Sequence, residues 1–273
     1  MKNIDLVSSK YTLLICSNDA YEDAWDPLFI LLKRYWLGLE NIPIILNTQT
    51  KEYKFDGLNI ISPQLYKKHF NSKMLPWSKI LRDTLIKVVK TKLVLIYLDD
   101  FFLRSPVNVD RLNKCLEFME EHPNAANITL ATCPQPYSPT EEYPWLVKRS
   151  KSAPYLFCLQ AGLWRRDRLL HFLRDHESPW YFERWGSLRG RRYLDDFYAL
   201  TLISEKQAIF DYDASIQGIK QGQWQPETSD LFFKEGIDID LSKMGIITLN
   251  NDKRKIQRNW LKTAWAIFQS LRP

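Results

Sequence analysis

The fold of this chain is constrained most by the alternation of short apolar runs with amphipathic segments. The apolar runs have the length and β-branched content of strands: TLLICS, IPIILNT, GLNIIS, LVLIYL, AANITLAT, YLFCLQAG, QAIFDYD and GIITLN. Apolar residues recur at three- and four-residue spacing over 25–39 and again over 81–88, where Ser78 is a candidate N-cap. Such alternation predicts an α/β fold, in which helices flank a mostly parallel central sheet.

Length and charge set the broad class of protein. The chain has 273 residues and no biased tract, which predicts a single domain over 1–273. The formal net charge of +6 favours anionic partners, such as phosphates, nucleic acid or an acidic membrane surface. The four cysteines are widely spaced and form no CxxC pair, which argues against a zinc site or a disulfide framework. Because no stretch reaches membrane-spanning length and no leader is visible, we expect a cytoplasmic location.

The string YLDDF occurs twice, and its first copy follows an apolar run. Asp99 and Asp100 come directly after KLVLIYL, which is typical of a buried central strand. Ligands of open α/β sheets bind at the carboxyl ends of the strands. Two carboxylates at such an edge suit Mg²⁺ or Mn²⁺ when phosphate oxygens and water complete the coordination. The alternative is a turn in which one aspartate caps a helix near Val109.

The second copy, at 193–197, has a different setting. In YLDDFYALTLIS the apolar residues recur at helical spacing after a basic, glycine-containing loop. We therefore expect a helix in which Asp195 or Asp196 caps the first turn or pairs with Arg191 or Arg192. The first copy is interpreted as part of a functional site, and the second as having a structural role.

Several segments resemble one enzyme family when they are read in order. They are SNDAYEDAW, PWSKILRDTL, LDDFFL, LQAGLWRRDRL and ESPWYFERWGS, within about residues 12 to 190. This order resembles bacterial nucleotide-sugar glycosyltransferases with a GT-A (Rossmann-like) fold, of the type used in capsule and lipopolysaccharide assembly. The resemblance implies a nucleotide-sugar donor, a glycan or lipid-linked oligosaccharide acceptor and no nucleic-acid partner. It also implies a nucleotide-sugar half at about 1–105 and an acceptor half at about 106–250.

The resemblance implies a metal site at the first YLDDF. GT-A enzymes typically carry an Asp-x-Asp motif whose divalent cation, Mn²⁺ or Mg²⁺, bridges the donor diphosphate. Here the matching triplet is Leu98-Asp99-Asp100, which makes Asp100 the better-matched ligand. Adjacent side chains on an extended strand point to opposite faces, so Asp99 is expected to contact the donor sugar or ribose rather than the metal, for which it is the second candidate ligand after Asp100. The missing first aspartate leaves open whether the metal is required.

The resemblance also implies a set of donor-binding residues. They are Ser17, Asn18, Asp19, Ser78, Arg82, Gln160, Trp164 and Lys220. The first three follow the first strand and suit a base or ribose, whereas Arg82 and Lys220 suit the diphosphate. Six of them have an ordinary alternative: "SND" capping the next helix, a solvated Arg82, a core Trp164, and Lys220 in a surface turn.

A carboxylate near the acceptor hydroxyl is needed as general base for inversion. The segment RDHESPWYFERWGS offers Glu183, with Glu177 as the second choice. Both lie among aromatic residues, and desolvation by such rings raises the pKa of a carboxylate toward the working range of a base. The alternative is an acid paired with Arg184 or Arg189.

The last segment, 251–273, predicts a basic amphipathic helix. Its apolar face is formed by Ile256, Trp260, Ala264, Ile267 and Leu271, and its beginning is rich in lysine and arginine. This pattern favours peripheral contact with the inner membrane surface. The alternative is a terminal helix docked on its own domain.

Two other functions remain open for the whole chain. A metal-dependent nuclease or phosphotransferase would use Asp99 and Asp100 together with the basic loop at 184–192. A non-catalytic carbohydrate-binding protein would use the high aromatic content, 14% of the residues.

Overall fold

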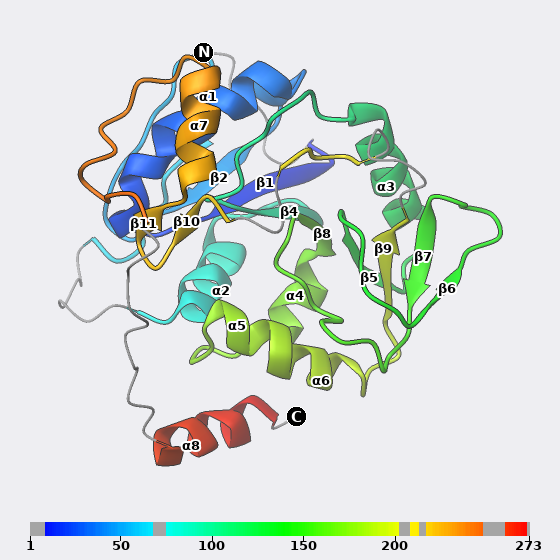
Figure 1. Cartoon of the computed structure of the whole chain (residues 1–273). Coiled ribbons are helices and arrows are strands. Elements are labelled where there is room, and N and C mark those ends of the chain that lie inside the picture. Colours follow the sequence, from blue (N-terminus) through cyan, green and yellow to red (C-terminus); the bar gives the residue numbers. More distant parts are fainter. Residues whose placement is uncertain (1–8, 68–74, 202–207, 213–216, 248–259, 272–273) are drawn as a thin grey trace.

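The structure, a computed structural model, describes residues 9–67, 75–201, 208–212, 217–247 and 260–271. Its centre is a mixed nine-stranded sheet with helices on both faces (Figure 1), which confirms the predicted α/β fold class. The strand order is β3-β2-β1-β4-β8-β5-β9-β7-β6. The strands are β1 Tyr11–Cys16, β2 Ile44–Asn47, β3 Ile60–Ile61, β4 Leu93–Leu98, β5 Ala125–Thr129, β6 Tyr137–Pro139, β7 Leu146–Arg149, β8 Gly162–Arg165 and β9 Asp196–Leu200. A separate hairpin pairs β10 Ile219–Lys220 with β11 Gln223–Trp224.

The sheet has a parallel half and a mixed half. Strands β3, β2, β1 and β4 are all parallel, and their register sets Cys16 beside both Asn47 and Leu98. The carboxyl ends of β1, β2 and β4 therefore meet at one edge. Strand β8 runs antiparallel to β4 and β5, β5 and β9 are parallel, and β7 and β6 are antiparallel. The expectation of a mostly parallel sheet thus describes β1 to β4 and not the second half.

Helices cover the two faces of the sheet. The longer ones are α1 Trp25–Tyr35, α2 Trp77–Lys87, α3 Val109–Glu121, α4 Arg166–Phe172, α7 Pro226–Lys234 and α8 Trp260–Leu271. The shorter elements are η1 Asp19–Ala24, η2 Leu39–Asn41, α5 Pro179–Tyr181, η3 Phe182–Gly186 and α6 Ser187–Gly190. Leu13 and Ile15 of β1 join one core cluster with α1 and α3, whereas Leu14 joins another with α2 and α4. This alternation is the period-two pattern of a strand buried on both faces.

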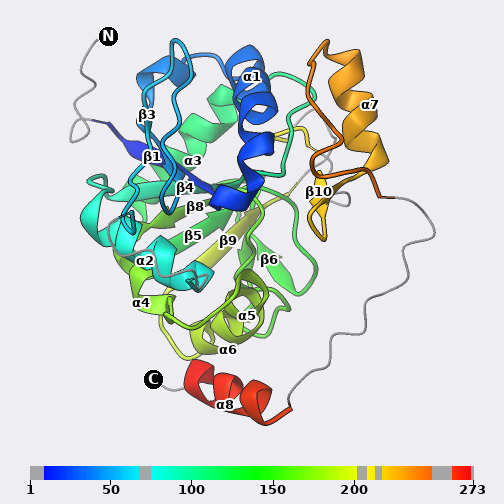
Figure 2. The ribbon, with the colours of Figure 1, turned by 90° about the vertical axis from the view of Figure 1, so that its left-hand side faces the viewer.

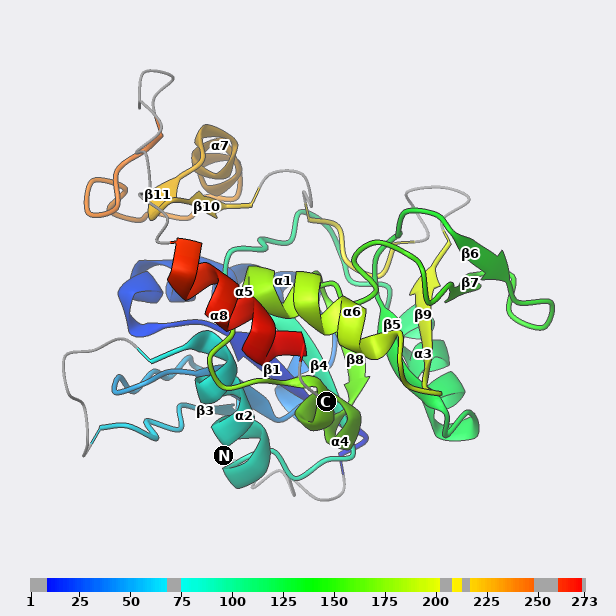
Figure 3. The same ribbon diagram turned by 90° about the horizontal axis from the view of Figure 1, so that it is seen from below.

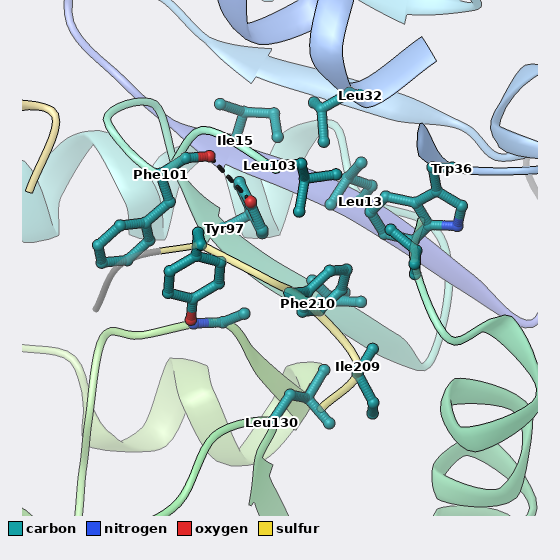
Figure 4. Packing of buried hydrophobic residues seen from close by; sticks show 14 of the residues in the cluster. Leu13, Ile15, Leu32, Trp36, Tyr97, Phe101, Leu103, Leu130, Ile209 and Phe210 are labelled. Atoms are coloured by element: carbon teal, nitrogen blue, oxygen red, sulfur yellow. Dashed lines mark hydrogen bonds between the residues drawn. The ribbon is translucent and has the colours of Figure 1, made fainter. Parts of the chain in front are cut away.

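The turn after β4 is fixed by the core beneath it. The hydroxyl of Tyr97 donates a hydrogen bond to the backbone oxygen of Phe101, 2.9 Å away (Figure 4). The Phe101 ring stacks on Tyr212 with centroids 4.4 Å apart, and Tyr97 meets Phe210 edge to face. Because both ends of the turn are anchored in this aromatic cluster, the backbone of Asp99 and Asp100 is held at the sheet edge.

The second YLDDF contradicts the helix predicted for it. It leads into β9, whose residues from Phe197 to Leu200 are buried between β5 and β7. A strand buried on both faces carries consecutive apolar residues, and these also match helical spacing. Asp195 pairs with Arg168 at 2.9 Å and Asp196 pairs with Lys148 at 2.8 Å, so the acids of this copy have structural partners.

Other local predictions differ from the structure as well. Helix α2 has Pro76 at its N-cap, which places Ser78 inside the first turn instead of at the cap. The predicted loop at 134–154 contains the hairpin β6–β7. The strand predicted over 155–162 begins only at 162, and the described residues 208–212 form no strand. Residues 248–259, including the basic start of the predicted C-terminal helix, lie outside the described residues.

Helix α8 forms an outer layer below α5 and α6 (Figures 2 and 3). Its last turn is docked on the domain, because Arg189 Nη1 donates to the backbone oxygen of Ser270 at 2.5 Å. His176 Nε2 also lies 2.9 Å from the Ser270 hydroxyl. Among the described residues, none of the helices has the length and apolar character needed to cross a bilayer.

Candidate functional site

The residues directly after β1 and β4 form a hydrogen-bonded chain with the first residue of α1 at the sheet edge. The indole Nε1 of Trp25 donates to the hydroxyl of Ser17 at 2.7 Å, and that hydroxyl donates to Asp99 Oδ2 at 2.5 Å. The Asp99 amide also donates to the Cys16 oxygen at 3.3 Å, continuing the ladder between the two strands. Ser17 and Asp99 are buried, so this contact fixes the Asp99 carboxyl against β1.

Both carboxyls of the first YLDDF have a raised pKa. Burial raises the pKa of Asp99, and the neighbouring Asp100 raises it further. Burial also raises the pKa of the Asp100 carboxyl. A divalent cation would relieve both penalties, since it supplies positive charge directly beside the carboxylates.

The donor set fits a metal that is shared with a substrate. Within the described ranges, no three His, Cys, Asp or Glu side chains form a ready-made metal site. Asp99 is committed to Ser17, whereas Asp100 is partly exposed and lines a cavity of about 70 Å³. Mg²⁺ in proteins is often bound by one or two carboxylates, with phosphate and water as the remaining ligands. Asp100 could supply such a carboxylate.

Asn18 and Asp19 shape the loop after β1. Asn18 Oδ1 accepts from the Ala20 amide at 2.9 Å and caps η1, as the ordinary alternative predicted. Asp19 instead accepts from the amides of Gln49 and Thr50, each at 2.8 Å, and from the Thr50 hydroxyl at 2.5 Å. Asp19 therefore ties the end of β1 to the segment after β2, which makes the loop rigid at this edge.

Helix α2 carries two of the predicted donor residues, Ser78 and Arg82. The Ser78 amide donates to the Glu177 oxygen at 3.2 Å, and the buried Ser78 hydroxyl has no hydrogen-bond partner within the described part of the chain. Arg82 lies further along the helix, half-exposed, with Nε 3.6 Å from Asp175. Its guanidinium therefore forms a surface ion pair with Asp175 in this structure.

Strand β8 separates the two residues predicted near the donor sugar. Ile96 of β4 is paired with Gly162, so Gln160 comes two residues before this pair, toward the carboxyl end of β4. Trp164, in contrast, is fully buried among Phe157 and Phe182. The prediction that Trp164 contacts the donor is therefore wrong: its ring fills the core.

The hairpin β10–β11 delivers Lys220 to the same edge. Gly218 lies two residues before Lys220, and its amide donates to the backbone oxygen of Asp100 at 2.9 Å. A Cβ on Gly218 would lie 2.3 Å from the Phe102 ring and 2.8 Å from the Asp100 oxygen, so only glycine allows this approach. Lys220 is exposed beyond it, which leaves its ammonium available to an anion.

The cavity beside Asp100 also contains a residue that the sequence analysis missed. Glu227, in the first turn of α7, lines the cavity together with Asp100, Arg104 and Gly218. The available signal was the string QPET, in which proline at the first helical position precedes an acid. Nothing in the sequence, however, indicates that α7 packs beside the end of β4.

The two candidate bases have opposite environments. Glu183 Oε1 accepts from the Leu159 amide at 2.8 Å, next to Gln160, and burial raises the pKa of Glu183. Glu177 is fully buried and receives both Arg189 nitrogens, Nη1 at 2.6 Å and Nη2 at 2.7 Å. Glu177 is therefore a structural ion-pair partner with no exposed oxygen for a base, and the structure contradicts its catalytic prediction.

Comparisons with known proteins include a distant structural likeness. No family model matches the chain, and no curated protein matches it. The crystal structure of S. aureus TarS residues 1–349 is similar with 13% sequence identity and a TM-score of 0.48, over 75% of this chain and 59% of that chain. This chain thus spans less than two thirds of the TarS structure. Because the likeness is so distant, the function has to be argued from the chain's own side chains.

Proposed function

We propose that the chain is a GT-A-like glycosyltransferase, which moves a sugar from a nucleotide donor to a glycan or lipid-linked oligosaccharide acceptor in surface polysaccharide assembly. The observation that carries the proposal is the position of Asp100. Its carboxyl has a raised pKa at the carboxyl end of a central parallel strand, and its backbone oxygen accepts from the Gly218 amide, directly before the hairpin that bears Lys220. Ligands of α/β sheets bind at such edges.

The donor would lie across the ends of β1 and β4. In this proposal the rigid loop formed by Asn18 and Asp19 receives the nucleotide, within the half at about 1–105. Asp100 would hold a divalent cation, which would supply positive charge beside the diphosphate, and Lys220 closes over the phosphates from the hairpin. The Lys220 ammonium stabilises the negative charge that develops on the leaving nucleotide, and a bound cation would add to this effect. Gln160, two residues before β8, faces the donor sugar.

The transfer step needs one further group. The bond between the anomeric carbon and the diphosphate oxygen breaks, while the acceptor hydroxyl oxygen forms the new bond to that carbon. Glu183 takes the hydroxyl proton as general base, so the nucleotide diphosphate leaves with the electron pair. A single displacement of this kind inverts the configuration at the anomeric carbon. Glu227 is the competing carboxylate, because it lines the Asp100 cavity.

A product assay tests the proposal. The purified protein is incubated with UDP-, GDP-, CMP- and dTDP-sugars and Mn²⁺, with and without glycan acceptors, and the released nucleotide is measured. We expect release from one donor class, increased by an acceptor and lost in Asp100→Asn. Asp110→Asn is the matched control, since Asp110 is exposed at the start of α3. Degradation of DNA or RNA with no nucleotide release would favour the nuclease alternative. Saccharide binding without release would favour the carbohydrate-binding alternative.

A further inference from the structure

The outermost helix of the molecule is docked by its last turn. Arg189 donates to the Ser270 oxygen, and Arg192 Nη1 donates to the Leu271 oxygen at 3.2 Å. His176 contacts the Ser270 hydroxyl. These contacts hold α8 against the helical segment α5–η3–α6, as seen from two directions in Figures 2 and 3. For this last turn, the structure therefore shows the alternative in which the terminal helix is docked on its own domain.

The side of α8 away from these contacts presents aromatic rings to solvent. Trp265 is 58% exposed and Phe268 is 50% exposed, with ring centroids 5.7 Å apart. Trp180 of the adjoining segment is 71% exposed. Leu194 lies two residues after Arg192, which is hydrogen-bonded to α8, and is 98% exposed. Single exposed apolar residues are common, but a group of large ones along one helix and its supports indicates an interaction surface.

Positive charge accompanies these residues. Arg191 and Arg192 are exposed between α6 and Leu194. Arg191 donates to the Ser152 oxygen at 3.1 Å and Arg192 to the Leu271 oxygen, so both guanidiniums bond to backbone carbonyls. In the part of the chain that the structure describes, neither arginine forms an ion pair with a carboxylate. Their charges are therefore available to an anionic partner.

We propose that this surface, called the α8 face and formed by Trp265 and Phe268 with Arg191 and Arg192 beside the end of α8, docks on an anionic lipid membrane. Aromatic side chains combine an apolar body with a polar edge and suit the boundary between headgroups and acyl chains. Arginines beside them attract lipid phosphates. A second copy of the chain is the less favourable occupant, because a two-fold contact would oppose the same cations to one another. The proposal does not depend on the proposed glycosyl transfer, because binding to vesicles and binding of a nucleotide are measured in separate experiments.

Cosedimentation of the full chain with vesicles tests the proposal. The vesicles are phosphatidylcholine containing about one third phosphatidylglycerol, compared with pure phosphatidylcholine. We expect binding to the anionic vesicles, weakened about tenfold or more in Trp265→Ala/Phe268→Ala. Phe233→Ala is the matched control, because Phe233 is an exposed aromatic on α7, at the other end of the molecule (Figure 2). It should bind as the wild type does.

A charge variant tests the same surface without changing the aromatic residues. Arg191→Gln/Arg192→Gln should weaken binding to anionic vesicles and reduce its dependence on salt. The proposal is overturned if the wild type does not bind the anionic vesicles, or if both double variants bind as tightly as the wild type. A dimer in light scattering that Trp265→Ala/Phe268→Ala abolishes, without vesicle binding, would assign the α8 face to a second copy and also overturn it.

Discussion

The hydroxyl of Ser17 donates to Asp99 Oδ2 at 2.5 Å and thereby joins the ends of two neighbouring parallel strands. Trp25 in turn donates to that hydroxyl, so three residues from β1, α1 and the turn after β4 form one buried chain. This chain commits Asp99 to the interior. Asp100, one residue later, is left to face the cavity beside α7.

Ser17→Ala should destabilise the fold and weaken donor use. The variant leaves the buried Asp99 carboxyl and the Trp25 indole without their shared partner, which costs about 1–3 kcal/mol of unfolding free energy. Urea denaturation measures this cost, and donor turnover should fall at the same time. Ser17→Thr keeps the hydroxyl and serves as the control. Equal stability of wild type and Ser17→Ala would contradict the role given to this contact.

Glu183 should set the acidic limb of the pH–rate profile. A base must be deprotonated, and burial raises the pKa of Glu183, so kcat/KM should increase with pH through a value above the ordinary range of about 4.3. Below that raised pKa the carboxyl holds its proton and the rate falls. Glu183→Gln should remove the limb and lower kcat by about 100-fold or more.

The competing base is tested in the same assay. Glu227→Gln should retain the acidic limb and most of kcat, because Glu227 is exposed and is not the proposed base. If Glu227→Gln loses activity while Glu183→Gln retains it, the general base is on α7 and the assignment to Glu183 is wrong.

Lys220→Ala should raise the KM of the donor by roughly three- to tenfold, with little change in stability. The side chain is exposed on a hairpin that is anchored to Asp100 through Gly218, so its removal affects only bound phosphate. Initial rates at varied donor concentration measure the effect. Lys234→Ala, at an exposed position at the end of α7, is the matched control. Equal KM values for the two variants would exclude Lys220 from the donor site.

The buried pair of Glu177 and Arg189 should be essential for stability. Arg189→Met leaves a carboxylate buried without a counter-charge and removes the donor to the Ser270 oxygen, at a cost of about 3–5 kcal/mol. The double variant Glu177→Met/Arg189→Met should recover part of that loss. Urea denaturation of both variants measures it. Lys54→Ala, which breaks an exposed pair, is the control and should change stability by less than about 1 kcal/mol.

The parallel half of the fold could be predicted because its signals are local. The apolar runs that become β1, β2 and β4 end in polar residues, and the rule for α/β sheets then places Ser17 and Asp99 at one edge. Glu183 was selected because it lies among aromatic residues, and the structure shows that burial does raise its pKa.

The rest depends on contacts that are distant in sequence. Strand β9 has the same apolar spacing as a helix, and only its pairing with β5 and β7 decides between them. Glu177 and Trp164 are residue types that often occur in binding sites. In the fold, however, Glu177 is buried against Arg189, and Trp164 is buried against Phe157. Glu227 reaches the cavity because Gly218 bonds to Asp100, an approach that no spacing rule predicts.

A nucleotide-sugar site at Asp100 is tested most directly by the thermal stability of the wild type and Asp100→Asn with UDP, GDP, CMP and dTDP, each with and without Mn²⁺. We expect one nucleotide to raise the wild-type Tm by roughly 5 °C at about a hundred times its Kd, only with Mn²⁺. Asp100→Asn should lose that shift. If none of the nucleotides changes the wild-type Tm, the sheet edge at Asp100 is not a nucleotide-sugar site.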